Sequence, residues 1–339
     1  MNKVWRHAPE SILEGTLERS KSNVDVSKSI EVSVPSTTAN MGPGFDVFGL
    51  AHDAFMDSVR IEIISGSKVD VDVVGVDSKS VSSDVGKNTA GIVANSLVKS
   101  LPSDCGLRLR IVKRIPVGKG LGSSGASAAA CVFGLNRLLG LSLSNDQMIQ
   151  LAADGEVASA GSAHADNVAA SVLGGFTIIQ SYEPFRVIAL PPPENLRIAV
   201  AIPEVSNGER KTAYARAVLP KLVSMEKMVS NVGHASGMIV GILTGDLNLI
   251  GRSMMDVVVE PERAKMIPGY WSVKKNALAA GAAGVAISGA GPTMIAIVDQ
   301  KISAVEVANV MREGFEDEGV TCKAFAAKPT KGATIVNES

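Results

Sequence analysis

The glycine-rich segment Pro116-Val-Gly-Lys-Gly-Leu-Gly-Ser-Ser-Gly-Ala-Ser127 has the composition of a phosphate-binding loop. It directly follows an apolar segment and leads directly into an alanine-rich segment that predicts a helix. Glycines let a backbone approach a ligand closely, and the start of a helix adds N–H groups and the positive end of the helix dipole. The loop therefore suits a chain of phosphates, although no Gly-Lys-Ser/Thr closes it as in the Walker A pattern.

The same loop permits two other interpretations. Gly120, Gly122 and Gly125 fit a literal G-x-G-x-x-G, which in dinucleotide-binding folds precedes, by about 20 residues, an acidic side chain that binds ribose. Asp146 has roughly that spacing, but it lies in a Ser-Asn-Asp sequence typical of a helix start. A nicotinamide-dependent oxidoreductase is therefore the weaker alternative, and a glycine turn that serves packing alone is the third.

A second group of polar residues occurs at Ser159-Ala-Gly-Ser-Ala-His-Ala-Asp-Asn167, shortly after Glu156. Mg²⁺ prefers carboxylate and hydroxyl oxygens and keeps water and phosphate in its shell. Glu156 and a hydroxyl of the glycine loop could supply such ligands, although a lone Glu on a helix is also compatible with a solvated face. His164 is compatible with a ligand contact or with a hydrogen-bonded structural role, because Asp166 and Asn167 crowd the same turn.

Two more glycine-containing loops flank apolar segments. The first is predicted at Pro35-Ser-Thr-Thr-Ala-Asn-Met-Gly-Pro-Gly44, and the second at Ile287-Ser-Gly-Ala-Gly-Pro292. The second loop could approach a ligand from the other half of the chain, or it could form a tight turn without one.

In this order and spacing, the three loops resemble the signature segments of the GHMP kinase superfamily. The matching segments are Pro35–Asp46, Pro116–Ser124 and Gly289–Pro292, and the resemblance covers about residues 29–330. Within the superfamily the sequence is similar to the homoserine kinase family. The phrases that indicate this family are Asn40-Met-Gly-Pro-Gly-Phe-Asp46, His164-Ala-Asp-Asn167, Ala215-Arg-Ala-Val-Leu-Pro220 and Val259-Glu-Pro-Glu-Arg263.

The resemblance implies ATP and Mg²⁺ as cofactors and L-homoserine as the small-molecule substrate, which would be phosphorylated on its hydroxyl. ATP would contact the loop positions Pro116, Val117, Gly118, Lys119, Gly120, Leu121, Gly122, Ser123, Ser124, Gly125 and Ala126. Ser124 and Glu156 would bind Mg²⁺. The residues around the substrate would be Asn40, Asp46, His164, Asn167, Arg216 and Arg263, and the catalytic positions would be Asp46, Glu156 and Thr212, with Thr212 near the transferred phosphoryl group.

The sequence departs from the family pattern at two positions. Gly125 stands where Ala is common, which weakens the first turn of the following helix by up to ~1 kcal/mol. The frequent Asp-Lys pair before the Glu-Pro-x-Arg phrase is Asp256-Val257, so a contact by that lysine is not expected.

The chemistry of these residues agrees with a zwitterionic substrate. Arg216 and Arg263 suit an α-carboxylate, whereas Asp46, Asn40 and Asn167 suit an ammonium group or a hydroxyl. Phosphoryl transfer depends mainly on positioning and charge stabilisation, so a general base is optional, and Asp46 could serve as a base or as a substrate ligand. A GHMP kinase for another alcohol, mevalonate or shikimate, is the main alternative, but mevalonate has no ammonium group for the acids to bind.

A strand is expected at Ser29–Val34, before the first loop, and the segments that follow alternate between strand and helix patterns. The further predicted strands are Val59–Ile64, Val69–Val74, Leu107–Lys113, Phe176–Gln180, Arg186–Leu190, Arg197–Ile202, one on each side of the 287–292 loop, and Cys322–Ala327. The predicted helices are Asn88–Ser100, Ser123–Leu139, Asn145–Ser159, Ala165–Leu173, 209–218, 222–243, 269–280 and one before the last strand.

The composition indicates a two-domain α+β protein. Its 339 residues are 46% hydrophobic, and Pro191-Pro-Pro193 marks the expected boundary near residue 190. The expected parts are an N-terminal extension (1–28), an N-terminal domain with the phosphate loop (29–190) and a C-terminal domain (191–339). The resemblance implies that the first domain is like domain 2 of ribosomal protein S5 and that the second is ferredoxin-like.

The bulk charge and the cysteines restrict the setting in which the protein works. A net charge of -1 provides no field for nucleic acid or an anionic membrane, and the glycine-interrupted stretch 276–298 does not predict a membrane helix. The extension has no apolar signal core. Three scattered cysteines suit a reducing cytoplasm, so a cytoplasmic location is expected. The resemblance implies a homodimer.

Overall fold

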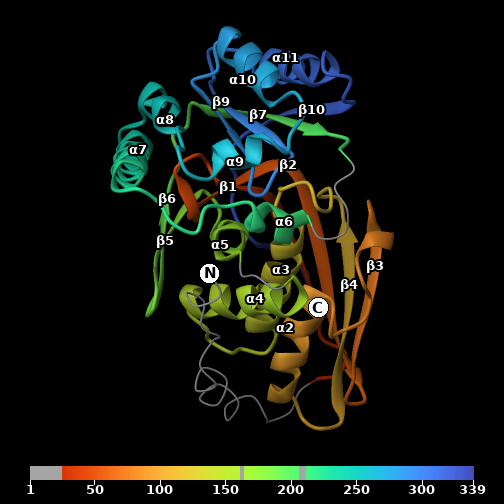
Figure 1. Ribbon diagram of the computed structural model, residues 1–339. Coiled ribbons are helices and arrows are strands. Elements are labelled where there is room, and N and C mark those ends of the chain that lie inside the picture. Colours follow the sequence, from red (N-terminus) through yellow and green to blue (C-terminus); the bar gives the residue numbers. More distant parts are fainter. Residues whose placement is uncertain (1–24, 161–163, 206–210) are drawn as a thin grey trace.

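The computed structural model describes residues 25–160, 164–205 and 211–339 (Figure 1). Most of the expected extension 1–28 lies outside these residues. The chain forms two β-sheets with helices packed on them, so the expected α+β class is confirmed. No helix in the described part of the chain is both long enough and apolar enough to cross a membrane.

The strands and helices follow one another along the chain in mixed order. The strands are β1 (Ser29–Asn40), β2 (Gly44–Ser65), β3 (Val69–Gly75), β4 (Cys105–Lys113), β5 (Phe176–Tyr182), β6 (Phe185–Leu190), β7 (Leu196–Pro203), β8 (Gly284–Ile287), β9 (Met294–Asp299), β10 (Cys322–Ala327) and β11 (Thr334–Glu338). The helices are α2 (Thr89–Leu97), α3 (Ser123–Leu138), α4 (Asn145–Ala160), α5 (Ala165–Leu173), α6 (Lys211–Ala217), α7 (Met225–Thr244), α8 (Leu247–Ser253), α9 (Glu260–Ala264), α10 (Tyr270–Ala279) and α11 (Ala304–Glu316).

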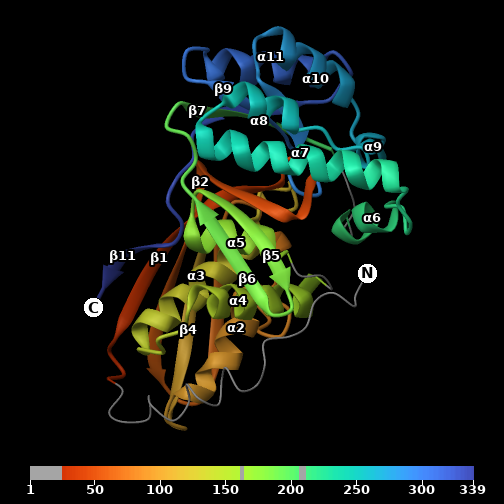
Figure 2. The same cartoon turned by 90° about the vertical axis from the view of Figure 1, so that its left-hand side faces the viewer.

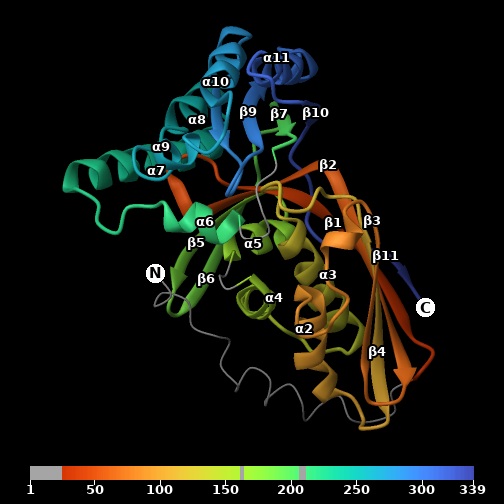
Figure 3. The ribbon, with the colours of Figure 1, turned by 45° about the vertical axis from the view of Figure 1, so that its right-hand side comes forward.

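The first sheet surrounds a group of helices on two sides. Its main arm has the strand order β11-β1-β2-β4-β3, and the β5–β6 hairpin joins it through β2. Figure 3 shows α2–α5 between this arm and the hairpin. All of its strand pairs are antiparallel except β3 with β4, so the sheet differs from a doubly wound dinucleotide-binding fold.

The second sheet has the order β10-β7-β9-β8, and its two faces pack against different helices. On β7, Ile198 and Val200 belong to the large core that includes residues of α7 and α8. Ala199 and Ala201 face the core of α10 and α11, which lie on the outer side of the sheet (Figure 2). The alternation of side chains along one strand therefore links the two cores.

Inward-facing positions of β2 and β4 are apolar until the strands reach the glycine loop. Leu109 and Ile111 of β4 are buried between the outward-facing arginines of the strand, and Val59 of β2 pairs with Ile111. Asp57 lies two residues before Val59 in β2, and Lys113 lies two residues after Ile111 in β4. Both are on the same face as their apolar neighbours, and both are buried. The apolar pattern thus gives way to a charged pair at the end of the strands.

Three expectations about the elements were wrong. A loop was expected from Pro35, but β1 continues to Asn40 because residues 35–40 pair with β2. For the same reason β2 begins at Gly44 rather than near Val59. The short helices α8 and α9 were not predicted, and neither was β11.

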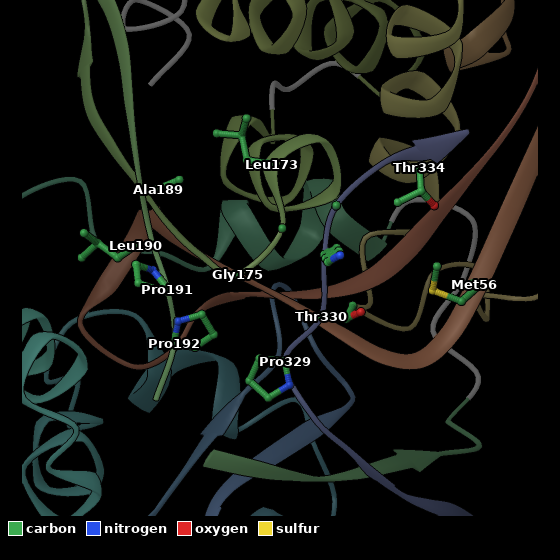
Figure 4. Close-up of a pocket in the computed structure, with 13 residues that line it drawn as sticks. Met56, Leu173, Gly175, Ala189, Leu190, Pro191, Pro192, Pro329, Thr330 and Thr334 are labelled. Carbon is green, nitrogen blue, oxygen red and sulfur yellow. The ribbon is translucent and has the colours of Figure 1, made fainter. Parts of the chain in front are cut away.

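The chain returns to the first sheet at its end. After β10, Thr330 donates its backbone N–H to the carbonyl of Ala51 in β2 at 3.1 Å, and β11 then pairs with β1. The division near residue 190 stays a prediction, but residues 334–338 pair with the sheet of the first half. The linker and this returning segment line one groove of ≈ 670 Å³, in which Pro191 and Pro192 lie near Pro329 (Figure 4).

Candidate active site

The glycine loop lies between β4 and α3, and contacts from three other segments hold it in place. Thr37 of β1 donates its backbone N–H to the carbonyl of Leu121 at 3.1 Å. Ser288 of the second glycine turn donates its hydroxyl to the carbonyl of Gly120 at 2.7 Å. The Lys119 side chain reaches the carbonyl of Pro203 at the end of β7, at 3.2 Å. The loop therefore joins the two halves of the chain.

The glycines of the loop have different reasons to be glycine. Gly120 has φ +81°, and a Cβ there would lie 2.3 Å from the Ser288 carbonyl oxygen. At Gly122, with φ +71°, a Cβ would lie 2.0 Å from the Thr37 hydroxyl. Gly118 also has φ +68°, but an added Cβ would meet no atom within 4 Å. Close packing thus requires two of the glycines, whereas Gly118 borders open space.

Most of the predicted metal and phosphate residues line one cavity of ≈ 140 Å³. Its walls come from residues 117, 118 and 120–125 of the glycine loop and the start of α3, together with the second glycine turn, whereas Pro116, Lys119 and Ala126 do not line it. Ser124, Glu156, His164 and Asn167 also line it, so the structure brings together residues from four separate segments. The helix α3 begins at Ser123 with Gly122 as its N-cap, which directs the positive end of its dipole toward the cavity.

Glu156 and His164 are hydrogen-bonded partners in this cavity. Glu156 is 2% exposed, and its Oε2 lies 2.8 Å from Nδ1 of His164. Burial opposes the charged imidazole, but the hydrogen bond and negative charge of Glu156 raise the pKa of His164 above its usual value. The solvated face that was one alternative for Glu156 is wrong, because the side chain is buried.

Asp46 and Arg216 form a bidentate ion pair next to the cavity residues. The two guanidinium NH groups of Arg216 lie 2.9 Å from the two carboxylate oxygens of Asp46. The backbone N–H of Asp46 also donates to the side-chain oxygen of Asn40 at 3.1 Å. Both Asn40 and Asp46 have positive φ, a conformation that costs free energy and that often occurs at functional sites.

Arg263 is buried beside this pair and is only 5% exposed. It donates to the carbonyl of Gly289 at 2.8 Å and to the carbonyl of Ala215 at 3.4 Å. The Phe45 ring lies close to both cations, with its centroid 5.2 Å from Cζ of Arg263 and 5.5 Å from Cζ of Arg216. Arg263 is therefore held inside the protein, whereas the Arg216 side chain is 22% exposed.

The two arginines lie on short helices, Arg216 on α6 and Arg263 on α9. These two helices lie next to each other (Figures 1 and 2). Asp256 determines where α9 starts. Its carboxylate accepts the backbone N–H groups of Val258, Val259 and Glu260 and the side-chain amide of Asn231 on α7. Asp256, the aspartate of the Asp-Lys pair that is frequent in the family, thus positions α9.

Two side chains that were not predicted as site residues, Asp166 and Tyr182, also lie beside Asp46. Asp166 in the first turn of α5 is buried, and burial together with the nearby Asp46 carboxylate raises the pKa of Asp166 to about 6. Its charge interacts with His164 and Arg216, which places it beside the Asp46–Arg216 pair. Tyr182 donates its hydroxyl to the Asp46 carbonyl at 2.6 Å. The sequence signal was present for Asp166, since it lies inside the segment already singled out.

The predicted positions of Thr212 and Asp146 have different outcomes. The side chain of Thr212 lies outside the described residues, so its place near the phosphoryl group stays a prediction. Asp146 does not approach the glycine loop, because it accepts the N–H of Val187 and lies 3.5 Å from Arg186 on β6. Together with the antiparallel sheet, this contradicts the oxidoreductase alternative.

Comparisons with known proteins identify the chain's relatives. Residues 88–175 match the family of GHMP kinases N terminal domains, and residues 238–317 match the GHMP kinases C terminal family. The chain is 41% identical over 287 residues to a homoserine kinase of Methanococcus vannielii, which covers 84% of this chain and 93% of that one. A homoserine kinase of Natronomonas pharaonis is 40% identical over 306 residues, which covers 90% of this chain and 99% of that one.

Solved structures give the same result. The crystal structure of homoserine kinase from Cytophaga hutchinsonii matches with a TM-score of 0.85 and 36% identity, over 93% of this chain and 99% of that chain. The structure of L. major mevalonate kinase in complex with R-mevalonate matches with a TM-score of 0.59 at 14% identity, which shows the shared fold alone.

The two domain matches, the glycine loop and the cavity beside it define a GHMP kinase. Within that class, the identity and coverage of the relatives decide the family. The chain belongs to the homoserine kinase family.

Proposed function

We propose that this protein transfers the γ-phosphoryl group of ATP to the hydroxyl of L-homoserine and forms O-phospho-L-homoserine, a step in threonine biosynthesis. The observation that supports this substrate is a compact cluster of two acids and two cations beside the glycine loop. Asp46 and Asp166 provide the negative charges, and Arg216 and Arg263 provide the positive charges. Such a cluster is complementary to a zwitterion.

The substrate would replace interactions that the protein makes with itself. The bidentate contact between Arg216 and Asp46 is the kind of contact that a guanidinium makes with an α-carboxylate. On binding, the carboxylate would take the place of Asp46 on Arg216, with Arg263 adding a second positive charge. Asp46 and Asp166 would then receive the ammonium group. This exchange keeps every charge paired.

The oxygen ligands of the cavity fit Mg²⁺. Ser124 supplies a hydroxyl and Glu156 a buried carboxylate in the same cavity as the glycine loop, and Mg²⁺ needs few protein ligands when phosphates and water complete its shell. Bound Mg²⁺ would neutralise charge on the transferred phosphoryl group. His164 would orient the Glu156 carboxylate through its 2.8 Å hydrogen bond. Thr212, as the family resemblance implies, would lie near that phosphoryl group.

The geometry favours a substrate-binding role for Asp46 over a role as general base. In the ligand-free chain both of its oxygens accept hydrogen bonds from Arg216, and once the substrate carboxylate takes that place the same oxygens would receive the ammonium group. Positioning by the loop and charge stabilisation by the helix dipole are sufficient contributions for phosphoryl transfer.

A coupled assay of ADP release over a panel of alcohols tests the function. We expect turnover of L-homoserine with Mg-ATP and no turnover of mevalonate or shikimate, because neither offers an ammonium group to Asp46 and Asp166. NAD(P)H should cause no thermal shift. Phosphorylation of mevalonate or shikimate with homoserine inert would contradict the substrate but retain the superfamily.

A homodimer and a cytoplasmic location complete the proposal. The α7 helix exposes an apolar stripe, and α7 has no charged Asp, Glu, Lys or Arg side chain from residue 228 to 244. A second copy with its own stripe would cover this surface. The stripe consists of Met225, Met228, Val229, Val232, Val240 and Leu243. Cys105, Cys131 and Cys322 are free and buried, which suits a reducing compartment.

A further inference from the structure

A buried ion pair lies directly behind the glycine loop, outside the cavity that binds ligands. The side chains of Asp57 and Lys113 are 0% and 2% exposed, and they contact each other directly. Removing two charges from water is costly, and a buried apolar pair of similar size often stabilises a protein at least as well. The pair therefore requires an explanation beyond packing.

Lys113 binds the exit of the loop. Its ammonium group donates to Asp57, to the carbonyl of Ser123 at 2.6 Å and to the hydroxyl of Ser127 at 3.0 Å. An ammonium group has three N–H donors, so each has a partner. Ser123 and Ser127 belong to the first turns of α3, the helix that follows the loop. The ammonium group thus fixes the start of that helix.

Asp57 binds the entrance of the loop. One carboxylate oxygen contacts Lys113, and the other accepts the backbone N–H groups of Arg114 at 2.6 Å and Ile115 at 2.8 Å. The hydroxyl of Ser123 adds a direct link by donating to the carbonyl of Ile115 at 3.1 Å. The residues before and after the loop are therefore connected through one buried pair.

We propose that Asp57 and Lys113 are positioning residues that hold the two ends of the glycine loop at a fixed separation and so preorganise its backbone for the phosphates of ATP. The inference rests on the proposed function. A loop whose ends can separate samples more conformations, and phosphate binding must then order it at the expense of affinity. Neither residue needs to touch the nucleotide for this effect.

The test removes the ion pair that connects the two ends of the loop, here called the tie, without leaving an unpaired buried charge. The double variant Asp57→Asn/Lys113→Met is neutral and similar in shape, and its amide oxygen can still accept the N–H groups of residues 114 and 115. Ser127→Ala is the milder variant, because it removes one acceptor of Lys113 and keeps both charges paired. Lys274→Met, which removes a partly buried cation from the second domain, serves as the matched control.

Two measurements report on the tie. Hydrogen exchange of residues 114–125 in the ligand-free protein reports loop order, and calorimetry gives the Kd for Mg-ATP. For the double variant we expect amide exchange about 10-fold faster and Mg-ATP binding about 10-fold weaker, with an unchanged KM for homoserine. Ser127→Ala should change both quantities in the same direction by less, and Lys274→Met should change neither.

Particular outcomes would overturn the proposal. If the loop amides of a folded double variant exchange at the wild-type rate, the pair does not hold the loop. Faster exchange with an unchanged Kd for Mg-ATP would show that loop order does not set affinity. If the double variant does not fold, wild-type exchange and affinity in Ser127→Ala decide against the tie. Absence of Mg-ATP binding by the wild type would contradict the proposed function instead, and the exchange rates would still report on the loop.

Discussion

At the scale of single residues, the site is built from charges that already satisfy one another before any substrate binds. Asp46 and Arg216 are bidentate partners, and Arg263 is bound to two backbone carbonyls. The two arginines therefore differ in what their loss would do. Replacing the buried Arg263 removes a donor from the carbonyls of Ala215 and Gly289, of which Gly289 keeps the side-chain amide of Asn40. Arg216 is 22% exposed in its side chain, and its removal affects mainly Asp46 and the substrate.

We predict that Arg216→Leu lowers kcat/KM for homoserine by about ten- to a hundredfold, which corresponds to the loss of a charge-assisted hydrogen bond of roughly 1.5–3 kcal/mol. The Kd for Mg-ATP should barely change. Against a homoserine analogue with a neutral amide in place of the carboxylate, the variant should lose little beyond what the wild type already loses.

Steady-state kinetics with both substrates provide this comparison. Equal losses against homoserine and the neutral analogue would mean that Arg216 acts on phosphate or on folding, and its assignment to the carboxylate would be wrong. A thermal melt separates the latter case, because a folding effect also lowers Tm.

At the scale of elements, the position of Arg263 depends on a helix of only five residues, α9, which has little stability of its own. Asp256 supplies the acceptors that the start of this helix needs, and Asn231 ties the same carboxylate to α7. The cap is therefore part of the machinery that places a cation in the site.

We predict that Asp256→Ala lowers the free energy of unfolding by roughly 2–4 kcal/mol, because the N–H groups at the start of α9 and the Asn231 amide lose their common acceptor. It should also raise KM for homoserine more than KM for ATP. Denaturant unfolding and steady-state kinetics measure the two effects.

Asp246→Ala is the matched control for this prediction. Asp246 caps α8 by accepting the N–H of Leu249 at 2.9 Å, but it is exposed and holds no site residue. We expect a loss of about 1 kcal/mol and unchanged kinetics. A proportional rise of both KM values in Asp256→Ala would indicate general destabilisation.

The elements also show how far the sequence could predict this protein. Helices α3 and α5 were predicted almost to the residue, because their apolar faces and the glycines beside them are local signals. The α9 helix was missed because it depends on Asp256 and on contacts with α7 and β8, which are distant in the sequence. The strand β11 was missed because all five of its residues are exposed and show no alternation.

The same distinction applies to the site. Loop residues and arginines were recognisable from the family resemblance, and the structure gathers most of them at one place. The pair Asp57–Lys113 was not recognised, although a sequence can reveal a charged residue at an inward-facing position of an otherwise apolar strand. The partner of each charge could be known only from the register of β2 against β4, which no local pattern encodes.

At the scale of the whole molecule, the proposed dimer makes the clearest prediction. Val232 on α7 is 58% exposed within the apolar stripe, and Val305 on α11 is also 58% exposed but lies elsewhere. We predict that Val232→Glu raises the dimer Kd by about 100-fold or more, because the interface would bury a carboxylate without a partner. Val305→Glu should leave the dimer intact.

Analytical ultracentrifugation over a concentration series measures this change. A wild type that sediments as a monomer throughout would contradict the homodimer. A dimer that survives Val232→Glu would move the interface away from α7. Circular dichroism of both variants confirms that the helices persist.

The pairing of β11 with β1 has a consequence for the order in which the protein is made. The ribosome releases β1 early. The strand β11, which pairs with the outer edge of β1, emerges only after both domains have been synthesised. Until then β1 is an edge strand with unpaired N–H and C=O groups, which can recruit other chains. Chaperone binding to nascent chains should therefore persist until the last strand emerges. A stop codon placed shortly before residue 334 would expose that edge permanently in a protein that still contains every predicted catalytic residue.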